Sequence, residues 1–196
     1  MTWEDAWREG RTGWDAGCAS PTLRRLVAEG SVAPGRALVP GCGAGYDVFA
    51  LAADDRVAVG LDLAPTAGER FAALREQQSL SADHAQIVIG DFFGYLPEAR
   101  FDVIFDYTFL CAIEPDQRQA WAEKMDALLA DGGELITLIF PVTDVPMRPG
   151  GPPYCMSPEL VRELLEPRFA HHVLEPVTES NPGREGKEWL GRWRRR

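Results

Sequence analysis

The sequence lacks long apolar segments and an excess of positive charge. Its longest apolar runs are short, such as 135–141, whereas a helix that crosses a bilayer needs about 20 apolar residues. The chain has 20 Lys and Arg against 30 Asp and Glu, which gives a formal net charge of −10. Nucleic-acid binders neutralise phosphates with cationic side chains. We therefore expect neither a membrane nor a nucleic acid as a partner.

Paired cysteines and metal-ligand spacings are also missing. None of the four cysteines belongs to a C-x-x-C pair, and the three histidines have no partner ligand at helical spacing. The sequence therefore predicts no metal site. The N-terminus, Met-Thr-Trp-Glu-Asp, has neither the basic start nor the apolar core of a secretory signal. We expect a cytoplasmic protein with reduced cysteines.

Strand-like and helix-like segments alternate through the middle of the chain. Apolar strands are expected at 36–40, 56–62, 85–90, 101–106 and 134–140, and helices at 46–53, 65–78 and 116–130. Gly132 and Gly133 stand just past the last of these helices, where glycine commonly ends a helix. Such alternation predicts an α/β fold in which a mostly parallel sheet has helices on both faces.

The last third of the chain departs from this alternation. Ser157 and Pro158 are typical of a helix N-cap and first turn, and they predict a helix that runs to about Glu166. The segments 170–177 and 188–193 predict an antiparallel hairpin at the sheet edge, which makes the sheet seven-stranded. Without a repeat or a linker, residues 1–196 are expected to form one domain. The Pro- and Gly-rich segment 141–153 is expected to be an active-site loop.

A glycine-rich segment, Gly41-Cys-Gly43-Ala-Gly45, follows the first expected strand. Glycines there let a ligand approach the backbone, at the strand end where open α/β sheets bind ligands. The next position is Tyr46, where the dinucleotide fingerprint has glycine, so the pattern suits a cofactor with adenosine but no pyrophosphate. Asp62 ends the next strand, 21 residues after Gly41. A carboxylate there can accept hydrogen bonds from ribose hydroxyls, although a plain surface aspartate is the structural alternative.

Two further strand ends carry polar and aromatic residues. Asp91 and Phe92, after the third strand, are placed to meet an adenine amino group and ring, and a turn with a core aromatic is the alternative. Tyr107, after the fourth strand, is placed to face a reactive methyl group. Taken together, the four strand ends resemble the class I S-adenosylmethionine-dependent methyltransferases, which have a Rossmann-like sandwich fold.

Other segments narrow this resemblance. They are Trp3-x-x-x-Trp7, the segment 10–15, Phe105-Asp-Tyr-Thr-Phe-Leu-Cys-Ala-Ile113, Gly150-Gly-Pro-Pro-Tyr154 and Gly186-Lys-Glu-Trp-Leu-Gly-Arg-Trp193. From about Trp3 to Trp193 the chain looks like the thiopurine S-methyltransferase family, closest to its thiol and halide methyltransferase branch.

The resemblance implies a cofactor, a lid and an oligomeric state. The cofactor is S-adenosyl-L-methionine, residues 1–30 form a helical lid over it, and the protein is a monomer. Trp3 and Trp7 lie one helical turn apart, so they can also simply attach an amphipathic helix to the body. The residues that the resemblance places against the cofactor are Trp3, Trp7, Trp14, Gly41, Asp62, Asp91, Phe92 and Tyr107.

The expected reaction is in-line methyl transfer to a small soft nucleophile. A thiol or sulfide is the favoured acceptor, a halide or thiocyanate comes next, and thiopurines or other chalcogen anions stay open. Tyr107 and Tyr154 are the candidate catalytic residues, because a phenol can orient a thiol or hydrogen-bond an anion. Tyr154 can instead only brace its loop. Two other classes also stay open: an NAD-dependent oxidoreductase and a non-catalytic protein that binds an adenosine ligand.

Overall fold

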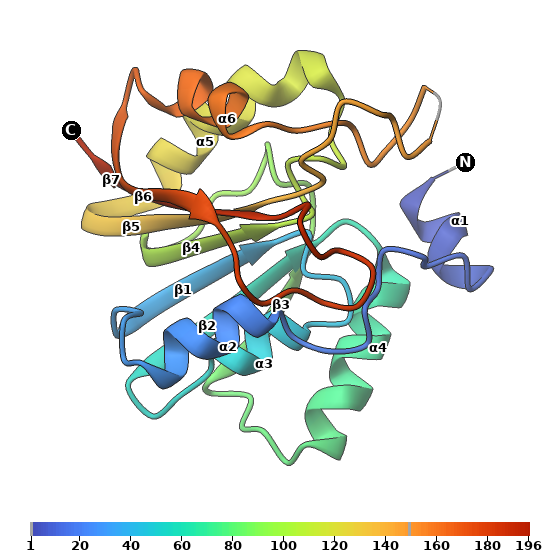
Figure 1. The fold of residues 1–196 in the computed structure, drawn as a ribbon. Coiled ribbons are helices and arrows are strands. Elements are labelled where there is room, and N and C mark those ends of the chain that lie inside the picture. Colours follow the sequence, from blue (N-terminus) through green and yellow to red (C-terminus); the bar gives the residue numbers. More distant parts are fainter. Residues whose placement is uncertain (1, 149) are drawn as a thin grey trace. The chain divides into compact units, whose positions relative to one another are not determined.

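The computed structural model describes residues 2–148 and 150–196 (Figure 1). The internal contacts divide the chain into two units, Met1–Glu98 and Ala99–Arg196, which are called the first unit and the second unit below. The prediction that residues 1–196 form one domain stays a prediction.

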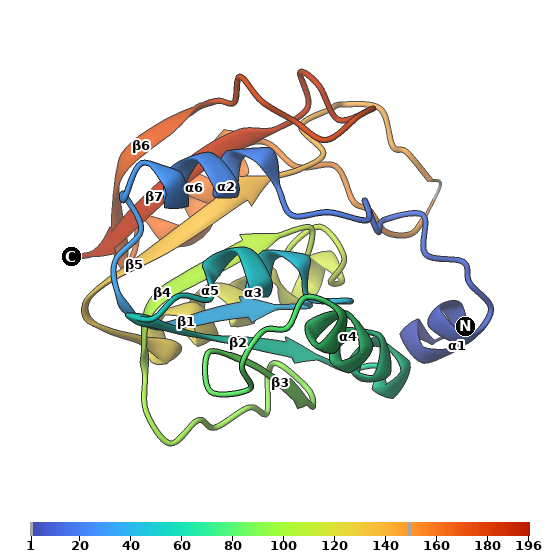
Figure 2. The same cartoon turned by 90° about the horizontal axis from the view of Figure 1, so that it is seen from below.

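The described residues of the first unit include three parallel strands, of which β2 pairs with both β1 and β3. The crossover helices α3 and α4 lie over these strands (Figure 2). Pro40 stands opposite Leu61, and Asp62 stands opposite Ile89, so the carboxyl ends of the three strands meet. The elements are α1 (Trp3–Arg8), α2 (Pro21–Ala28), β1 (Gly35–Pro40), α3 (Tyr46–Leu51), β2 (Arg56–Asp62), α4 (Pro65–Gln77) and β3 (Ala85–Ile89).

The two N-terminal helices pack on different partners, α1 on α4 and α2 on α3. Helix α1 begins with a capping box: Thr2 Oγ1 accepts the Asp5 amide at 3.1 Å, and the Asp5 carboxylate accepts the Thr2 amide at 2.9 Å. Helix α2 begins at the N-cap Ser20, whose own amide donates to the Asp47 carboxylate at 2.8 Å. The expected lid, residues 1–30, therefore contains two separately attached helices.

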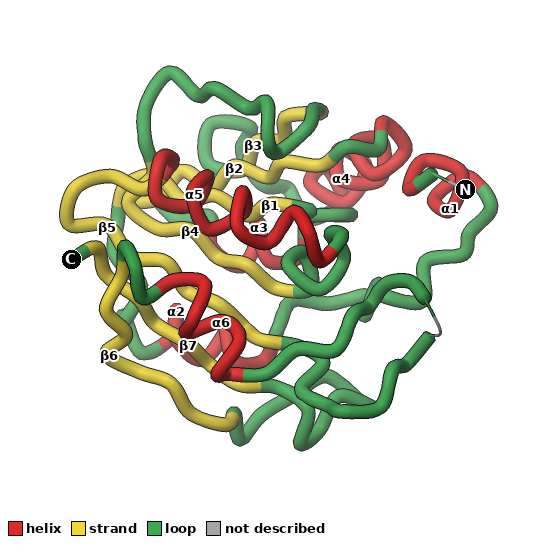
Figure 3. Tube along the Cα trace, turned by 90° about the horizontal axis from the view of Figure 1, so that it is seen from above, coloured by secondary structure: helices red, strands yellow, loops and turns green. Residues whose placement is uncertain are grey.

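The described residues of the second unit include four strands. Strands β4 and β5 are parallel, and β7 is antiparallel to both β5 and β6, so the predicted C-terminal hairpin is confirmed. Helices α5 and α6 lie side by side (Figure 3). Ser157 caps α6 as expected, because its hydroxyl accepts the Leu160 amide at 3.1 Å. The elements are β4 (Phe101–Tyr107), the 3₁₀ turn η1 (Pro115–Gln117), α5 (Arg118–Leu128), β5 (Leu129–Ile139), α6 (Pro158–Leu165), β6 (Phe169–Pro176) and β7 (Trp189–Arg195).

The boundary between α5 and β5 differs from the expectation. The helix ends at Leu128, and Leu129 is already extended, fully buried and paired with Phe101. Gly132 has a φ of +78° and lies inside β5, where the pairing with β4 shifts register. The prediction that the glycines at 132 and 133 end a helix was wrong. Burial of Leu129 in the strand starts β5 early, and the glycine serves a bulge.

In the described part of the chain, the strands follow the order β3-β2-β1 in the first unit and β4-β5-β7-β6 in the second unit. The predicted fold class, α/β with a mostly parallel sheet and an antiparallel C-terminal hairpin, is confirmed. Within the described residues, none of the helices combines the length and apolar character needed to cross a membrane.

Candidate cofactor and acceptor sites

The glycine loop follows β1 in the first unit. Gly41, Gly43 and Gly45 all have positive φ values, of 59°, 54° and 92°, which residues with a side chain rarely adopt. A Cβ atom at Gly45 would lie 2.2 Å from the Phe71 ring, and one at Gly43 would lie 3.2 Å from the Trp7 ring. Both the backbone conformation and the close packing therefore require glycine in this loop.

Asp62 connects the end of β2 to the glycine loop. Its Oδ2 accepts the Gly43 amide at 2.8 Å, and its Oδ1 accepts the Ala64 amide at 2.9 Å. Burial raises the pKa of this carboxyl. Each carboxylate oxygen can accept a second hydrogen bond. A carboxylate oriented in this way by two amides fits the hydroxyl pair of a ribose.

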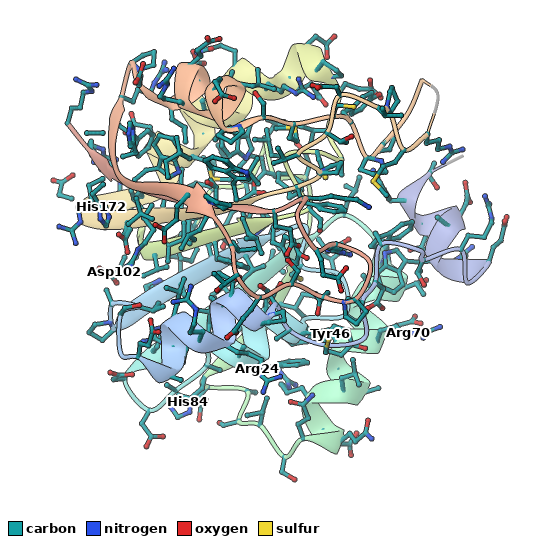
Figure 4. All side chains as sticks on the ribbon, in the orientation of Figure 1. Arg24, Tyr46, Arg70, His84, Asp102 and His172 are labelled. Atoms are coloured by element: carbon teal, nitrogen blue, oxygen red, sulfur yellow. The ribbon has the colours of Figure 1, made fainter. Side chains whose placement is uncertain are left out.

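Three tryptophans gather beside the glycine loop. Trp14 contacts Trp3 and Trp7 edge to face, with ring centroids 5.2 Å and 5.9 Å apart. Trp7 is buried and belongs to a cluster with Ala44, Ala64 and Ala67. Tyr46 packs on the same cluster, and the Arg70 side chain of α4 lies near it (Figure 4). The structure thus brings Trp3, Trp7 and Trp14 together and adds Tyr46 to them.

Asp91 and Phe92 follow β3 in two different environments. The Gly90 amide donates to the Asp62 carbonyl at 2.9 Å, which brings this segment next to the end of β2. Asp91 is exposed, and its Oδ2 accepts the Gly94 amide at 2.8 Å. Phe92 is buried and contacts Phe93 edge to face. Asp91 therefore lies in a turn and Phe92 is a buried aromatic residue, as in the structural alternative named above. Their contacts with the cofactor stay predictions.

Glu4, which had no role in the sequence analysis, attaches α1 to α4. Its carboxylate accepts the Thr66 amide at 3.0 Å and the Thr66 hydroxyl at 2.7 Å. The hydrogen bonds from Thr66 lower the pKa of Glu4, and Arg8 contributes to the same effect. Thr66 lies in the first turn of α4, whose amides favour a carboxylate.

We expect Glu4→Ala to loosen α1. The substitution removes both hydrogen bonds to Thr66, so amide hydrogen exchange of residues 3–8 should become about fivefold faster. Glu9→Ala is the matched control, because Glu9 pairs only with the nearby Arg11 within the described contacts. Unchanged exchange in Glu4→Ala would mean that the tryptophan cluster alone holds the helix.

Tyr107 ends β4 in the second unit and belongs to a buried polar cluster. Its hydroxyl donates a hydrogen bond to Oε1 of Glu188, a residue that is 2% exposed and directly precedes β7. The Arg184 guanidinium lies 5.0 Å from the Tyr107 ring centroid and 4.8 Å from that of Phe140. Burial is the main cause that raises the pKa of Tyr107. The phenol therefore carries its proton at neutral pH.

Tyr154 has a different set of partners. Its hydroxyl donates to Glu114 Oε2 at 2.5 Å, and its amide donates to the Cys111 carbonyl at 2.8 Å. The Arg118 guanidinium lies 6.0 Å from its ring centroid. The hydrogen bond to Glu114 raises the pKa of Tyr154. The two candidate catalytic tyrosines are thus held by separate carboxylates.

The turn after β4 holds a buried carboxylate and a buried thiol. Asp106 accepts the Trp121 indole at 2.8 Å and the Leu110 amide at 3.2 Å, and burial raises its pKa to about 6. Cys111 donates to the Thr108 carbonyl at 3.3 Å, and burial raises its pKa to about 12. Cys111 therefore stays a thiol and acts as a buried core residue. A small cavity borders this turn, lined among others by Asp106, Thr108, Cys111, Thr137 and Met156.

Comparison with known proteins identifies the family. The model of the family described as "Thiopurine S-methyltransferase (TPMT)" matches residues 1–194. The chain belongs to this family. As a member of the thiopurine S-methyltransferase family it is an S-adenosylmethionine-dependent methyltransferase. The predicted family and enzyme class are confirmed, and the oxidoreductase and the non-catalytic binding protein are set aside.

Individual relatives include plant enzymes. "Probable thiol methyltransferase 2" of Arabidopsis thaliana is 46% identical over 195 residues, and "Thiocyanate methyltransferase 1" of Brassica oleracea is 45% identical over 194 residues. Each match covers 98% of this chain and 84% of the relative. Among solved structures, the fold resembles that of a Burkholderia thailandensis 1,6-didemethyltoxoflavin-N1-methyltransferase with bound S-adenosylhomocysteine, at a TM-score of 0.74 and 22% identity. That match covers 97% of this chain and 84% of the other.

Sequence reasoning assigned no role to four residues that the structure places in these sites. Glu4 and Thr66 hold α1, while Glu188 and Arg184 surround Tyr107. Only Glu188 had a signal, because it lies in the segment 186–193 that carried part of the family resemblance. Within the part of the chain that the structure describes, no three His, Cys, Asp or Glu side chains gather as metal ligands.

Proposed function

We propose that this methyltransferase transfers the methyl group of S-adenosylmethionine to a small soft nucleophile, with a thiol or sulfide as the favoured acceptor. A halide or thiocyanate is the next candidate. The observation that carries this proposal is the identity of about 45% to plant thiol and thiocyanate methyltransferases along nearly the whole chain. Thiopurines and other chalcogen anions are the second candidate, which the name of the matching family model favours.

For the cofactor we propose contacts with residues of the first unit. Asp62 accepts the ribose hydroxyls, Gly41 lets the cofactor approach the backbone, and Asp91 and Phe92 receive the adenine. Trp3, Trp7 and Trp14 exclude water from the bound cofactor, because their rings already pack together. When bound, the cofactor supplies an electrophilic methyl group on a positively charged sulfur.

For the acceptor we propose contacts with two tyrosines of the second unit. Tyr107, which the sequence analysis also assigned to the cofactor, and Tyr154 orient a thiol acceptor for in-line attack. Their hydroxyl directions are fixed by Glu188 and Glu114. Fixed phenol oxygens can accept a hydrogen bond from a thiol better than freely rotating ones, because less freedom is lost on binding.

Calorimetric titration with S-adenosylmethionine, followed by incubation with separate thiols, halides, thiocyanate and a thiopurine, tests this function. We expect binding, and S-adenosylhomocysteine in amounts equal to the methylated thiol. Turnover only with the thiopurine would move the assignment to the second candidate. Binding without turnover on any acceptor would overturn the proposed acceptor class.

We also propose that the enzyme works as a monomer in the cytoplasm, as expected from the sequence. Size-exclusion chromatography with light scattering should give one species near the chain mass of 21.7 kDa. A species of twice this mass would contradict the monomer.

A further inference from the structure

One oxygen of the buried Glu188 carboxylate has no hydrogen-bond partner among the described residues. Oε1 accepts the Tyr107 hydroxyl, whereas Oε2 is buried and accepts nothing within the described chain. Leaving a carboxylate oxygen buried without a donor is energetically unfavourable. A ligand or proton donor that reaches this oxygen would remove that cost.

The hydrogen bond between Tyr107 and Glu188 also fixes what the phenol can do. A phenol has one proton, and Tyr107 donates it to Glu188. Its oxygen therefore presents only lone pairs, one of which faces the side-chain amide of the buried Asn181, and the other is left for a third group. While Glu188 is ionised, Tyr107 can accept a hydrogen bond from a neutral thiol but cannot donate one to an anion. This limits the sequence-based expectation that the phenol binds an incoming anion.

We propose that Tyr107 and Glu188 form a proton relay that deprotonates a thiol acceptor during methyl transfer, an inference that rests on the proposed function. The S–H bond breaks as its proton passes to the Tyr107 oxygen, and the proton of Tyr107 passes to Glu188 Oε1. The electron pair left on sulfur attacks the methyl carbon, and the bond from that carbon to the sulfonium breaks. Glu188, now a carboxylic acid, returns its proton through Tyr107 to solvent after the product leaves.

The surroundings of Tyr107 favour such a relay. The Arg184 cation over the Tyr107 and Phe140 rings stabilises negative charge as it passes through the phenol and forms on sulfur. Because burial raises the pKa of Tyr107, the phenol does not lose its proton between turnovers. In the proposed relay the phenol gives up its proton to Glu188 Oε1 as it receives the proton of the thiol.

The proposed relay matters only for acceptors that must lose a proton before they attack the methyl group. An alkyl thiol, with a pKa of about 8.5, is mostly protonated at pH 7 and needs the relay. Thiocyanate and iodide have no proton to lose, so they bypass Glu188. An alkyl thiol at a pH above its own pKa also bypasses Glu188, because it is already an anion.

Glu188→Gln tests the relay with little change in shape. The amide oxygen of glutamine still accepts the Tyr107 hydroxyl, but the side chain cannot take a proton. At pH 7 we expect kcat/KM for an alkyl thiol to fall at least about 30-fold, and kcat/KM for thiocyanate to stay within about twofold of wild type. With the thiol, the variant's rate should rise about tenfold per pH unit up to the pKa of the thiol, because only the thiolate then reacts.

Glu175→Gln is the matched control, because Glu175 is exposed on β6 of the same unit. It should behave as wild type with every acceptor. Thermal unfolding of both variants reports whether they fold. If thiocyanate proves to be no substrate of wild type, the thiol above its pKa takes its place, and the variant should there approach wild-type rates.

Three results would overturn the relay. Equal losses with protonated and proton-free acceptors would show that Glu188 only positions Tyr107. An unchanged thiol rate in Glu188→Gln would show that no proton reaches Glu188. Absence of turnover by wild type on all acceptors would instead remove the proposed function and the relay with it.

Discussion

Asp62→Asn is expected to weaken S-adenosylmethionine binding by at least about 30-fold, because it changes the group proposed to hold the ribose. The Asp62 carboxylate now accepts the Gly43 and Ala64 amides with separate oxygens. Asparagine has one carbonyl oxygen and one amide nitrogen, so its NH₂ group would face a backbone donor. Calorimetric titration of wild type and variant measures the change in Kd.

The same carboxylate predicts a pH dependence of cofactor affinity. Since burial raises the pKa of Asp62, its protonation begins at a higher pH than for an exposed aspartate. Protonation removes acceptor capacity, so affinity should fall as the pH drops through that range.

Asp54→Asn is the control for Asp62→Asn, because Asp54 is exposed and precedes the opposite end of β2. It should bind the cofactor as wild type does. Asp62 also orders the glycine loop, so thermal unfolding is measured in parallel. A destabilised Asp62→Asn that still binds the cofactor normally would make Asp62 an anchor of the loop and not a cofactor ligand.

The parts of the fold that local sequence determines were predictable. The strand predicted at 56–62 matches β2, because apolar residues run through it and Asp62 ends it. The glycine loop was predictable because glycine is the residue that most readily adopts a positive φ, and positions 41, 43 and 45 all have positive φ values. At Leu129 the same local reasoning failed, since pairing with Phe101 starts a strand where the nearby glycines suggested a helix end.

The polar partners of the site were not predictable because they are distant in sequence. Glu188 is 81 residues from Tyr107, and Glu4 is 62 residues from Thr66. The antiparallel pairing of β5 and β7 places Trp189 opposite Ile139, and so it positions Glu188 at that end of the strands. Sequence spacing gives the strands and their order of appearance, but not which side chain of one strand meets which side chain of another.

Tyr107→Phe is expected to lower kcat with an alkyl thiol about 100-fold while the Kd for S-adenosylmethionine stays within about twofold of wild type. Phenylalanine keeps the ring under Arg184 and beside Phe140, and it removes only the hydroxyl that Glu188 accepts. Steady-state kinetics gives kcat, and calorimetry gives Kd. Equal losses in kcat and in cofactor affinity would assign Tyr107 to cofactor binding instead of the chemical step.

The double variant Tyr107→Phe/Glu188→Gln connects this expectation to the relay. If one relay needs both groups, removing either one stops the deprotonation of the thiol, and removing both costs no more than the larger single loss. Two independent roles would instead multiply the two losses. Methylation of thiocyanate, which has no proton to lose, distinguishes two roles of the Tyr107 hydroxyl. If the hydroxyl acts only in the relay, the thiocyanate rate stays nearly unchanged in all three variants. If it orients every acceptor, the thiocyanate rate falls in both variants that lack Tyr107.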